Sequence, residues 1–375
     1  MVNKQRLLDL FAEMAEIGSV SGKEHEFRDF ITAVFKKRGF TVEEDQAGQA
    51  FAGSCGNLLI KKVGTTDLPP LLFAAHMDTV EPGENIKVII EREVIKSAGN
   101  TILGADDKAA IAALVESIDI IRENNLTCPP LEILLTVGEE QGLMGAKKFD
   151  YSELKAQIGF TLDAGGKPGT IIIKSPCQNE IEYIAYGKAA HAGINPEDGV
   201  NAIKLVSQAI AKMPCGRIDD ETTCNFGVIS GGKARNIVAD YCSVRGEVRS
   251  LNRIKLDNLT RSLQDIFIDS VNSGGGQAEV KVTFLYPEIS LNPADKVIEL
   301  AAKAVKKTGL PLILAATGGG SDASIINAHI PCANLAIGMQ DVHTSEEYIL
   351  VNDLVDDVRL ILAIIDEYCR SMKEA

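Results

Sequence analysis

Four apolar runs share the feature that most constrains the fold of this chain: each leads into an acidic residue or a histidine. The runs are 70–80, 131–140, 158–166 and 332–344, and their polar residues are His76, Asp78, Glu139, Glu140, Asp163 and His343. Nearly continuous apolar strands separated by helical patterns predict an α/β fold, a mostly parallel sheet flanked by helices. The carboxyl ends of such strands border the functional crevice. These polar residues are therefore expected to converge in space.

A stretch with a different pattern interrupts the α/β chain. Residues from about 181 to 287 predict strand, helix, strand, strand, helix and strand, the βαββαβ order of an α+β sandwich. Gly, Pro and Asn in the flanking segments 165–169 and 288–293 are typical of linkers. We therefore expect a metal-binding catalytic domain formed by residues 1–178 and 289–375, and an inserted domain formed by residues 179–288.

Composition excludes several classes of partner. The net charge is −14, there is no Trp, and Lys and Arg form no cluster, which argues against nucleic-acid binding. Acidic residues interrupt the first helical pattern, and no apolar run approaches the roughly 18 residues of a membrane span. The eight scattered cysteines form no C-x-x-C pair and are expected to be reduced. These features predict a cytoplasmic protein with no membrane partner.

The polar strand ends offer the donors of a metal centre. Asp106 adds a further carboxylate at the beginning of the helical pattern after Gly104, where the helix dipole favours acidic residues. Two imidazoles and three carboxylates suit Zn²⁺, with Mn²⁺ or Co²⁺ as alternatives. If Asp106 bridges two ions, each ion also receives one terminal carboxylate and one histidine. Each motif alone is equally explained as a polar loop, so the prediction depends on their combination: His76, Asp106, Glu140, Asp163 and His343.

Such a centre predicts hydrolysis of an amide bond. Two ions about 3.5–4 Å apart polarise a carbonyl and activate a bridging hydroxide. Glu139, adjacent to the ligand Glu140, is the candidate general base. Asp78 lies two residues after His76 and can orient its imidazole. The chain contains no G-x-S-x-G, H-E-x-x-H or Walker motif that would indicate another mechanism.

The chain resembles the peptidase T, aminoacylase and carboxypeptidase G family of dinuclear zinc hydrolases, and the peptidase T-like branch most of all. The resemblance covers nearly the whole chain through the ordered motifs GSVSGKEHEF, HMDTV, GADDKAA, GEEQGLMGAK, TLDAGG, GKAAHAG, ARNIVAD, GGGSDAS and VHTSEEYI. It implies a catalytic domain interrupted by a smaller ferredoxin-like domain that usually mediates dimerisation. A homodimer formed through the inserted domain is therefore expected.

The same resemblance implies a role for each site residue. One metal would be bound by His76, Asp106 and Asp163, and the other by Asp106, Glu140 and His343. Asp106, rather than Asp107, would be the bridge, with Asp78 as the orienting residue and Glu139 as the general base.

Three residues of the inserted domain resemble the family's substrate-binding groups. His191 matches a histidine that stabilises the tetrahedral intermediate, often across the dimer. Asn236 and Arg249 match groups that hold the substrate backbone and its terminal carboxylate. Gly318 departs from the tripeptidase pattern, which has an arginine there, and glycine cannot form the bidentate contact that arginine makes. A preference for tripeptides therefore does not follow from the sequence.

These observations predict a dinuclear zinc metallo-exopeptidase that acts on small peptides, as an aminopeptidase or a di- or tripeptidase. A hydrolase of N-acyl or N-carbamoyl amino acids would use the same site and is the alternative. A non-catalytic metal-binding scaffold would be expected to lack Glu139 or one of the ligands, and all of them are present.

Overall fold

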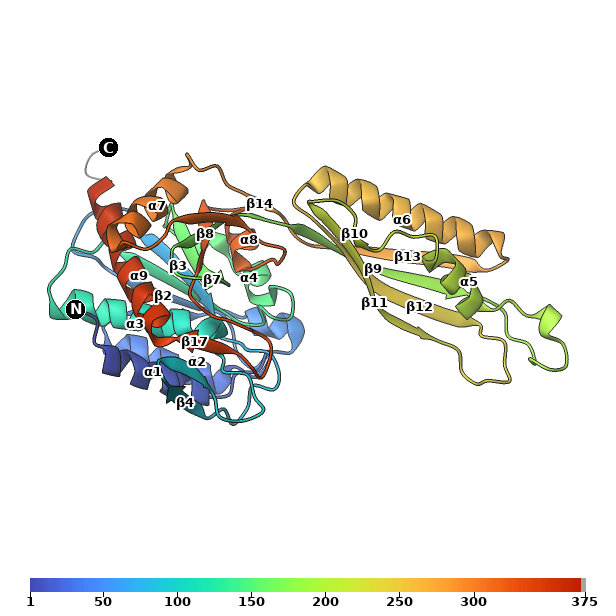
Figure 1. The fold of residues 1–375 in the computed structure, drawn as a ribbon, viewed down its shortest axis with the longest axis horizontal. Coiled ribbons are helices and arrows are strands. Elements are labelled where there is room, and N and C mark those ends of the chain that lie inside the picture. Colours follow the sequence, from blue (N-terminus) through green and yellow to red (C-terminus); the bar gives the residue numbers. More distant parts are fainter. Residues whose placement is uncertain (372–375) are drawn as a thin grey trace. The chain divides into compact units, whose positions relative to one another are not determined.

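The computed structural model describes residues 1–371 and divides the chain into two compact units (Figure 1). The larger unit contains Met1–Ile173, Leu291–Ala316 and the chain from Ser321 onward. The inserted unit contains Lys174–Ser290 together with Thr317–Gly320. The sequence placed the inserted domain at residues 179–288 and left the short segment 317–320 outside it.

The larger unit contains a mixed sheet with the strand order β1-β2-β6-β3-β7-β16-β8. The central strands β6, β3, β7 and β16 are parallel, while β1, β2 and β8 pair antiparallel. The strands are β1 (Thr41–Glu44), β2 (Leu58–Lys62), β3 (Leu71–His76), β6 (Leu131–Thr136), β7 (Gly159–Ala164), β8 (Thr170–Ser175) and β16 (Cys332–Ala336), and β15 (Ile313–Ala316) pairs with β8. The predicted α/β class is confirmed.

Helices account for the burial of these strands. Every residue of β3 and β6 is buried, which explains why both sequences are apolar throughout instead of alternating. The helices are α1 (Lys4–Glu16), α2 (His25–Lys37), α3 (Ala105–Glu123), α4 (Met144–Lys148), α7 (Lys296–Thr308), α8 (Asp322–Ile326) and α9 (Val351–Ser371). Helix α3 packs against β3 and β7 and also contacts α1 and α9, so nearly all of it is buried.

Short elements complete the larger unit. A three-stranded sheet has the order β17-β5-β4, formed by β4 (Val88–Glu91), β5 (Val94–Ser97) and β17 (Tyr348–Leu350). Two 3₁₀ helices span Ala47–Phe51 and Tyr151–Glu153. The pairing of β17 with β5 fixes the chain that follows the predicted ligand His343.

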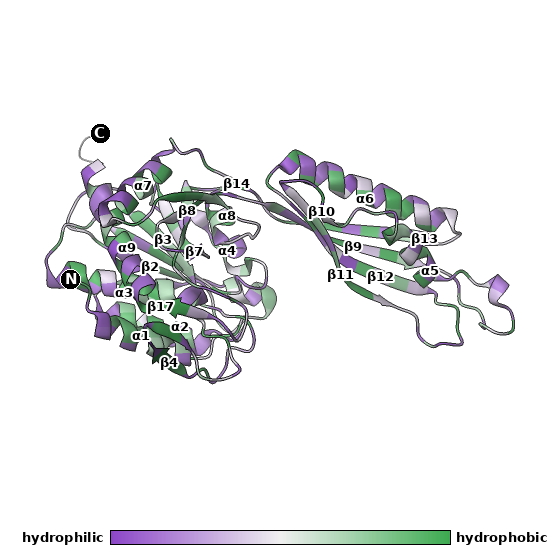
Figure 2. Cartoon of the chain, in the orientation of Figure 1, coloured by the Kyte–Doolittle hydropathy of each residue, from purple (hydrophilic) through white to green (hydrophobic). Residues whose placement is uncertain are grey.

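The inserted unit has its own antiparallel sheet, with the order β10-β11-β12-β9-β13. Its elements are β9 (Cys177–Tyr186), a 3₁₀ helix (Pro196–Asp198), α5 (Ala202–Ile210), β10 (Gly216–Arg217), β11 (Thr222–Gly231), β12 (Tyr241–Ser250), α6 (Arg253–Ser273), β13 (Gln277–Tyr286) and β14 (Ile289–Ser290). Hydrophilic and hydrophobic residues alternate along α6 (Figure 2), typical of a helix with one buried face. On its buried side, Phe267 packs against Tyr183 of β9 in a separate hydrophobic core.

Within the part of the chain that the structure describes, no helix combines the length and apolar character required to cross a bilayer.

Candidate metal centre

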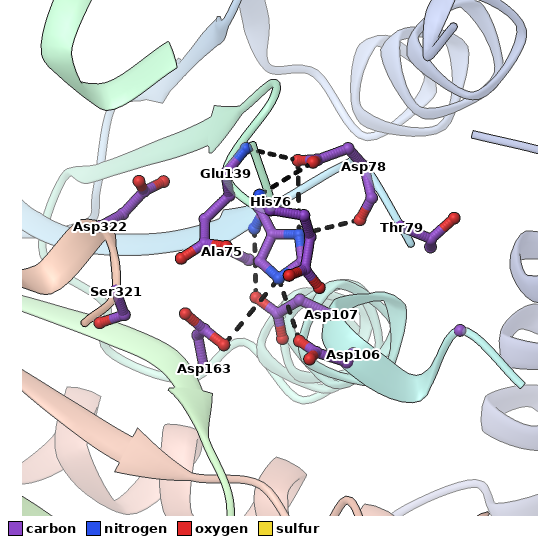
Figure 3. Close-up of polar contacts among 12 residues, drawn as sticks. Ala75, His76, Asp78, Thr79, Asp106, Asp107, Glu139, Asp163, Ser321 and Asp322 are labelled. Atoms are coloured by element: carbon purple, nitrogen blue, oxygen red, sulfur yellow. Dashed lines mark hydrogen bonds and ion pairs between the residues drawn. The ribbon is translucent and has the colours of Figure 1, made fainter. Parts of the chain in front are cut away.

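The imidazole of His76 lies at the carboxyl end of β3 among carboxylates from three segments (Figure 3). Its Nδ1 donates a hydrogen bond to the backbone carbonyl oxygen of Asp78 at 2.9 Å. Its Nε2 is 3.0 Å from Asp106 Oδ1 and 3.9 Å from Asp163 Oδ1. The backbone N–H of His76 donates to Asp107 Oδ2 at 3.1 Å. The contact at Nδ1 therefore fixes the ring so that Nε2 faces the carboxylates.

The carboxylate of Asp106 lies between two histidines. Its Oδ1 faces His76 Nε2, and its Oδ2 is 3.3 Å from Nε2 of His343. The chain can present the carboxylate in this way because Gly104 has a positive φ of 74° and Asp106 has a non-helical ψ of 98° at the beginning of α3. His343 Nε2 is also 2.8 Å from Glu140 Oε1. Each imidazole thus contacts a different oxygen of the same carboxylate.

The turn that carries Glu139 and Glu140 is bound by the carboxylate of Asp78. The backbone N–H of Glu139 donates to Asp78 Oδ1 at 2.9 Å, and that of Glu140 donates to Oδ2 at 3.1 Å. The Ser21 hydroxyl also donates to Oδ2, at 2.6 Å. The nearest carboxylate oxygen of Asp78 is 3.5 Å from Nδ1 of His76. Asp78 therefore contacts both the histidine that it was predicted to orient and the turn with the predicted base.

Burial and mutual repulsion shape the electrostatics of this cluster. Burial raises the pKa of Asp163 well above its usual value, and repulsion from Asp106 adds to the effect. Burial likewise raises the pKa of Glu139, with repulsion from Asp163 as the next cause. Burial would also raise the pKa of Asp106, but hydrogen bonds from His343 and His76 outweigh it and lower that pKa. The hydrogen bond to Asp106, followed by that to Glu140, raises the pKa of His343 to about 10.

These shifts indicate a cluster with an excess of negative charge, and a divalent cation would relieve it. One donor atom each from His76, Asp106 and Glu140 lie within 4.8 Å of one another. Asp163 and His343 adjoin this group through the contacts given above. Imidazole nitrogens and carboxylate oxygens are ligands that Zn²⁺ and related divalent metals accept. The residues present therefore fit a metal centre.

The three predicted substrate-binding residues lie in the inserted unit. His191 is exposed, and its Nδ1 accepts a hydrogen bond from the backbone N–H of Gly193 at 3.1 Å. The backbone carbonyl of Asn236 accepts from Ala192, so the segments that carry His191 and Asn236 lie side by side.

Arg249, the third of these residues, projects from β12. Its guanidinium donates to Glu247 through Nε at 2.8 Å and through Nη2 at 3.1 Å. Its Nη1 donates to the carbonyl oxygen of Gly318 at 3.3 Å. Arg249 therefore contacts the loop in which the tripeptidase pattern has an arginine of its own.

Several buried polar residues at the centre were not predicted from the sequence. Asp322 at the beginning of α8 accepts a hydrogen bond from Thr136, and burial raises its pKa to about 6. The Asn334 side chain bonds to both the N–H and the carbonyl oxygen of Asp163, each at 3.1 Å. Glu347 accepts hydrogen bonds from the backbone N–H groups of Leu103, Gly104 and Asp106 around the beginning of α3. Asp322 and Glu347 belong to the motifs GGGSDAS and VHTSEEYI, but their partners are too distant in sequence to be inferred from these motifs.

Two family models match the chain. The model described as a peptidase dimerisation domain of M20 type matches residues 177–274, and the model of peptidase family M28 matches residues 57–201. The protein YqjE of Bacillus subtilis (strain 168) is 41% identical over 368 residues, which cover 98% of this chain and 99% of YqjE.

Two solved structures are similar over the full length. The aminopeptidase PepT of Bacillus cereus ATCC 10987 has 40% sequence identity and a TM-score of 0.91, covering 98% of this chain and 99% of its own. A tripeptidase of Staphylococcus aureus subsp. aureus Mu50 has 36% identity and a TM-score of 0.95, covering 99% and 100%.

Proposed function

The chain belongs to the peptidase T-like branch of the M20 peptidases and is a hydrolase of peptide bonds, and we propose that it is a dinuclear zinc exopeptidase acting on small peptides. The observation that carries this proposal is the carboxylate of Asp106, whose two oxygens face different imidazoles. Each imidazole has a second carboxylate nearby, Asp163 on one side and Glu140 on the other.

Two groups of ligands are proposed for the metals. His76, Asp106 and Asp163 would hold one ion, while Asp106, Glu140 and His343 would hold the other. Bound there, the two ions would supply Lewis-acid activation of the scissile carbonyl and of the attacking water. The choice of zinc follows from the mixed imidazole and carboxylate donors, with Mn²⁺ and Co²⁺ as alternatives.

Glu139 is proposed as the general base. Its backbone is fixed by the hydrogen bond to Asp78, and its side chain is buried. Burial raises its pKa above the usual value of a glutamate, and a carboxylate with a raised pKa is a stronger base. Its carboxylate would accept a proton from water and return it to the leaving nitrogen. His76 would stay oriented by its contact with the Asp78 carbonyl.

The inserted unit is proposed to bind the substrate and to form a homodimer. His191, Asn236 and Arg249 are the proposed substrate contacts. The match to a peptidase dimerisation domain covers most of this unit. Its strands expose large apolar side chains, among them Ile229 at 57% and Phe284 at 40%. Exposed apolar side chains of this kind on one sheet are typical of a surface that a second copy covers.

A second candidate is the hydrolysis of N-acyl or N-carbamoyl amino acids at the same centre. Gly318 favours it, because this position lacks the arginine that would hold the carboxylate of a tripeptide. Arg249 contacts the carbonyl of this residue and could hold a single terminal carboxylate instead. We propose the cytoplasm as the site of action, since none of the eight cysteines, all of which the structure describes, forms a disulfide, and seven of them are buried.

Metal content and a substrate panel test this proposal together. The wild type, purified without chelator, is expected to bind about two Zn²⁺ per chain and to cleave peptides in a reaction that chelator abolishes. Glu139→Gln should retain the metal and lose about 10²–10⁴-fold in kcat. Absence of metal binding after reconstitution, or an active Glu139→Gln variant, would contradict the mechanism. Bound metal with cleavage of acylated amino acids alone would favour the second candidate.

Glu132→Gln is the matched control. Glu132 is equally buried in β6, but its carboxylate accepts hydrogen bonds from the backbone N–H groups of Lys155 and Ala156. Its substitution should lower stability while leaving kcat within about twofold of the wild type, because none of these contacts reaches a predicted ligand.

A further inference from the structure

We propose that Glu347 is a positioning residue that fixes the backbone of Asp106 and couples it to the loop carrying His343, an inference that rests on the proposed metal-dependent function. Glu347 is buried, with 1% of its surface exposed. Its Oε2 accepts hydrogen bonds from the backbone N–H groups of Leu103 at 2.7 Å and Gly104 at 2.8 Å. Its Oε1 accepts from the N–H of Asp106 at 3.1 Å.

The irregular beginning of α3 is the reason that this carboxylate is required. The first N–H groups of a helix have no partner within the helix. Here Gly104 is in the left-handed region and Asp106 and Asp107 depart from helical angles, so the preceding N–H groups also need an outside acceptor. These groups are buried, and an unpaired buried N–H is costly. A single carboxylate satisfies three of them through charge-assisted hydrogen bonds.

The backbone of Glu347 belongs to the loop that carries His343. The backbone N–H of Glu347 donates to the carbonyl oxygen of Thr344 at 3.2 Å, which closes a turn directly after His343. Gln340 and Tyr348 exchange backbone hydrogen bonds of 2.9 and 3.1 Å at the base of the same loop. The loop is thus closed on both sides of His343.

This loop therefore contacts Asp106 twice. Glu347 binds its backbone N–H, and Nε2 of His343 lies 3.3 Å from its carboxylate. The first contact orients the residue, and the second contact is made to Oδ2, whereas Oδ1 faces His76. Both oxygens of Glu347 are occupied by N–H groups, so its part is to position Asp106 and not to bind metal. Groups of this kind typically account for 10–100-fold in metal affinity.

A helix cap without this role would affect stability alone, and the experiment separates the two cases. Zn²⁺ affinity would be measured on the full chain by competition with a chelator, alongside the Tm of the metal-free protein. Glu347→Gln removes the charge and sets an amide N–H₂ against at least one backbone N–H. We expect about 10–100-fold weaker Zn²⁺ binding, together with a lower Tm.

Glu116→Gln is the matched control, because Glu116 is also 1% exposed and lies on α3, the helix whose beginning Glu347 binds. It accepts hydrogen bonds from the N–H of Asn3 and from the Arg6 guanidinium, away from the metal centre. This variant should lower the Tm and leave Zn²⁺ affinity within about twofold of the wild type.

Glu347→Asp provides a second variant in case Glu347→Gln does not fold. It keeps the charge but is one methylene shorter, so it should give an intermediate loss of affinity. Unchanged Zn²⁺ affinity in a folded Glu347 variant would reduce the residue to a cap and overturn the inference, while leaving the proposed function intact. A wild type that binds no Zn²⁺ would overturn both.

Discussion

The substitution Asp78→Asn tests how the turn of the proposed general base is held. The Asp78 carboxylate accepts three hydrogen bonds, from the N–H groups of Glu139 and Glu140 and from the Ser21 hydroxyl. Asparagine has one acceptor oxygen, and its amide N–H₂ cannot accept from a backbone N–H. In either orientation of the amide, one of the two backbone donors therefore loses its acceptor.

The size of the stability loss in Asp78→Asn follows from the burial of this residue. Asp78 is completely buried, so the orphaned N–H cannot bond to water instead. A buried hydrogen bond to a charged group contributes about 1.5–3 kcal/mol, and an unsatisfied buried donor costs about 1–3 kcal/mol. We expect the substitution to lower the free energy of unfolding of the metal-free larger unit by about 2–3 kcal/mol. For a unit of this size that corresponds to a Tm lower by roughly 4–12 °C. Activity should fall as well, because the backbone of Glu139 is no longer fixed.

Thermal unfolding in chelator, followed by circular dichroism, measures this effect without a contribution from metal. Ser21→Ala is the graded comparison, because it removes only the hydroxyl and should cost about 0.5–1.5 kcal/mol. If metal-free Asp78→Asn has the same Tm as the wild type while its Zn²⁺ affinity falls, Asp78 acts only through His76, whose Nδ1 is 3.5 Å from the Asp78 carboxylate. The reasoning from the turn would then be refuted.

Two further predictions concern protonation. Burial, followed by repulsion from Asp353, raises the pKa of Asp357 on α9, and within the described residues neither of its carboxylate oxygens has a hydrogen-bond partner. An unfolded Asp titrates near pH 3.9, so the wild type should lose stability as pH rises from about 4 through the higher folded pKa. Asp357→Asn should remove this loss; denaturant titrations that show the same pH slope for both proteins would contradict it. Separately, Zn²⁺ affinity should increase with pH below about 10, because His343 must lose its proton to become a ligand. A pH-independent affinity in chelator competition would rule out His343 as a ligand.

Much of the architecture follows from local sequence patterns. The apolar runs around Phe73 and Ile133 predict strands buried on both faces, and in the structure every residue of β3 and β6 is buried. In the inserted unit, α6 separates β12 from β13, as the βαββαβ pattern predicts. Both patterns depend on the spacing of apolar side chains, which is read along one segment at a time. The family membership inferred from the ordered motifs is also confirmed.

Boundaries were less predictable than the elements themselves. The inserted unit begins at Lys174, within β8, whereas the sequence placed its first residue at 179. It also includes Thr317–Gly320, which is far from the remainder in sequence. Membership of a compact unit depends on contacts between distant segments, and the local composition of a linker carries little information about them.

By itself, the sequence determined the kind of sheet, the inserted βαββαβ segment, and the set of imidazoles and carboxylates at the strand ends. Only the tertiary structure decided how these groups are held. Asp78 binds a turn 61 residues away, and Glu347 binds a helix beginning 241 residues away. The physical reason is that periodicity fixes which face of a segment is buried, whereas a buried N–H donates to whichever carboxylate folding brings within reach. The proposed ligands, and Asp78 beside His76, could thus be predicted from the chain, but the contacts of Asp78 with the turn of Glu139 and of Glu347 with the beginning of α3 could not.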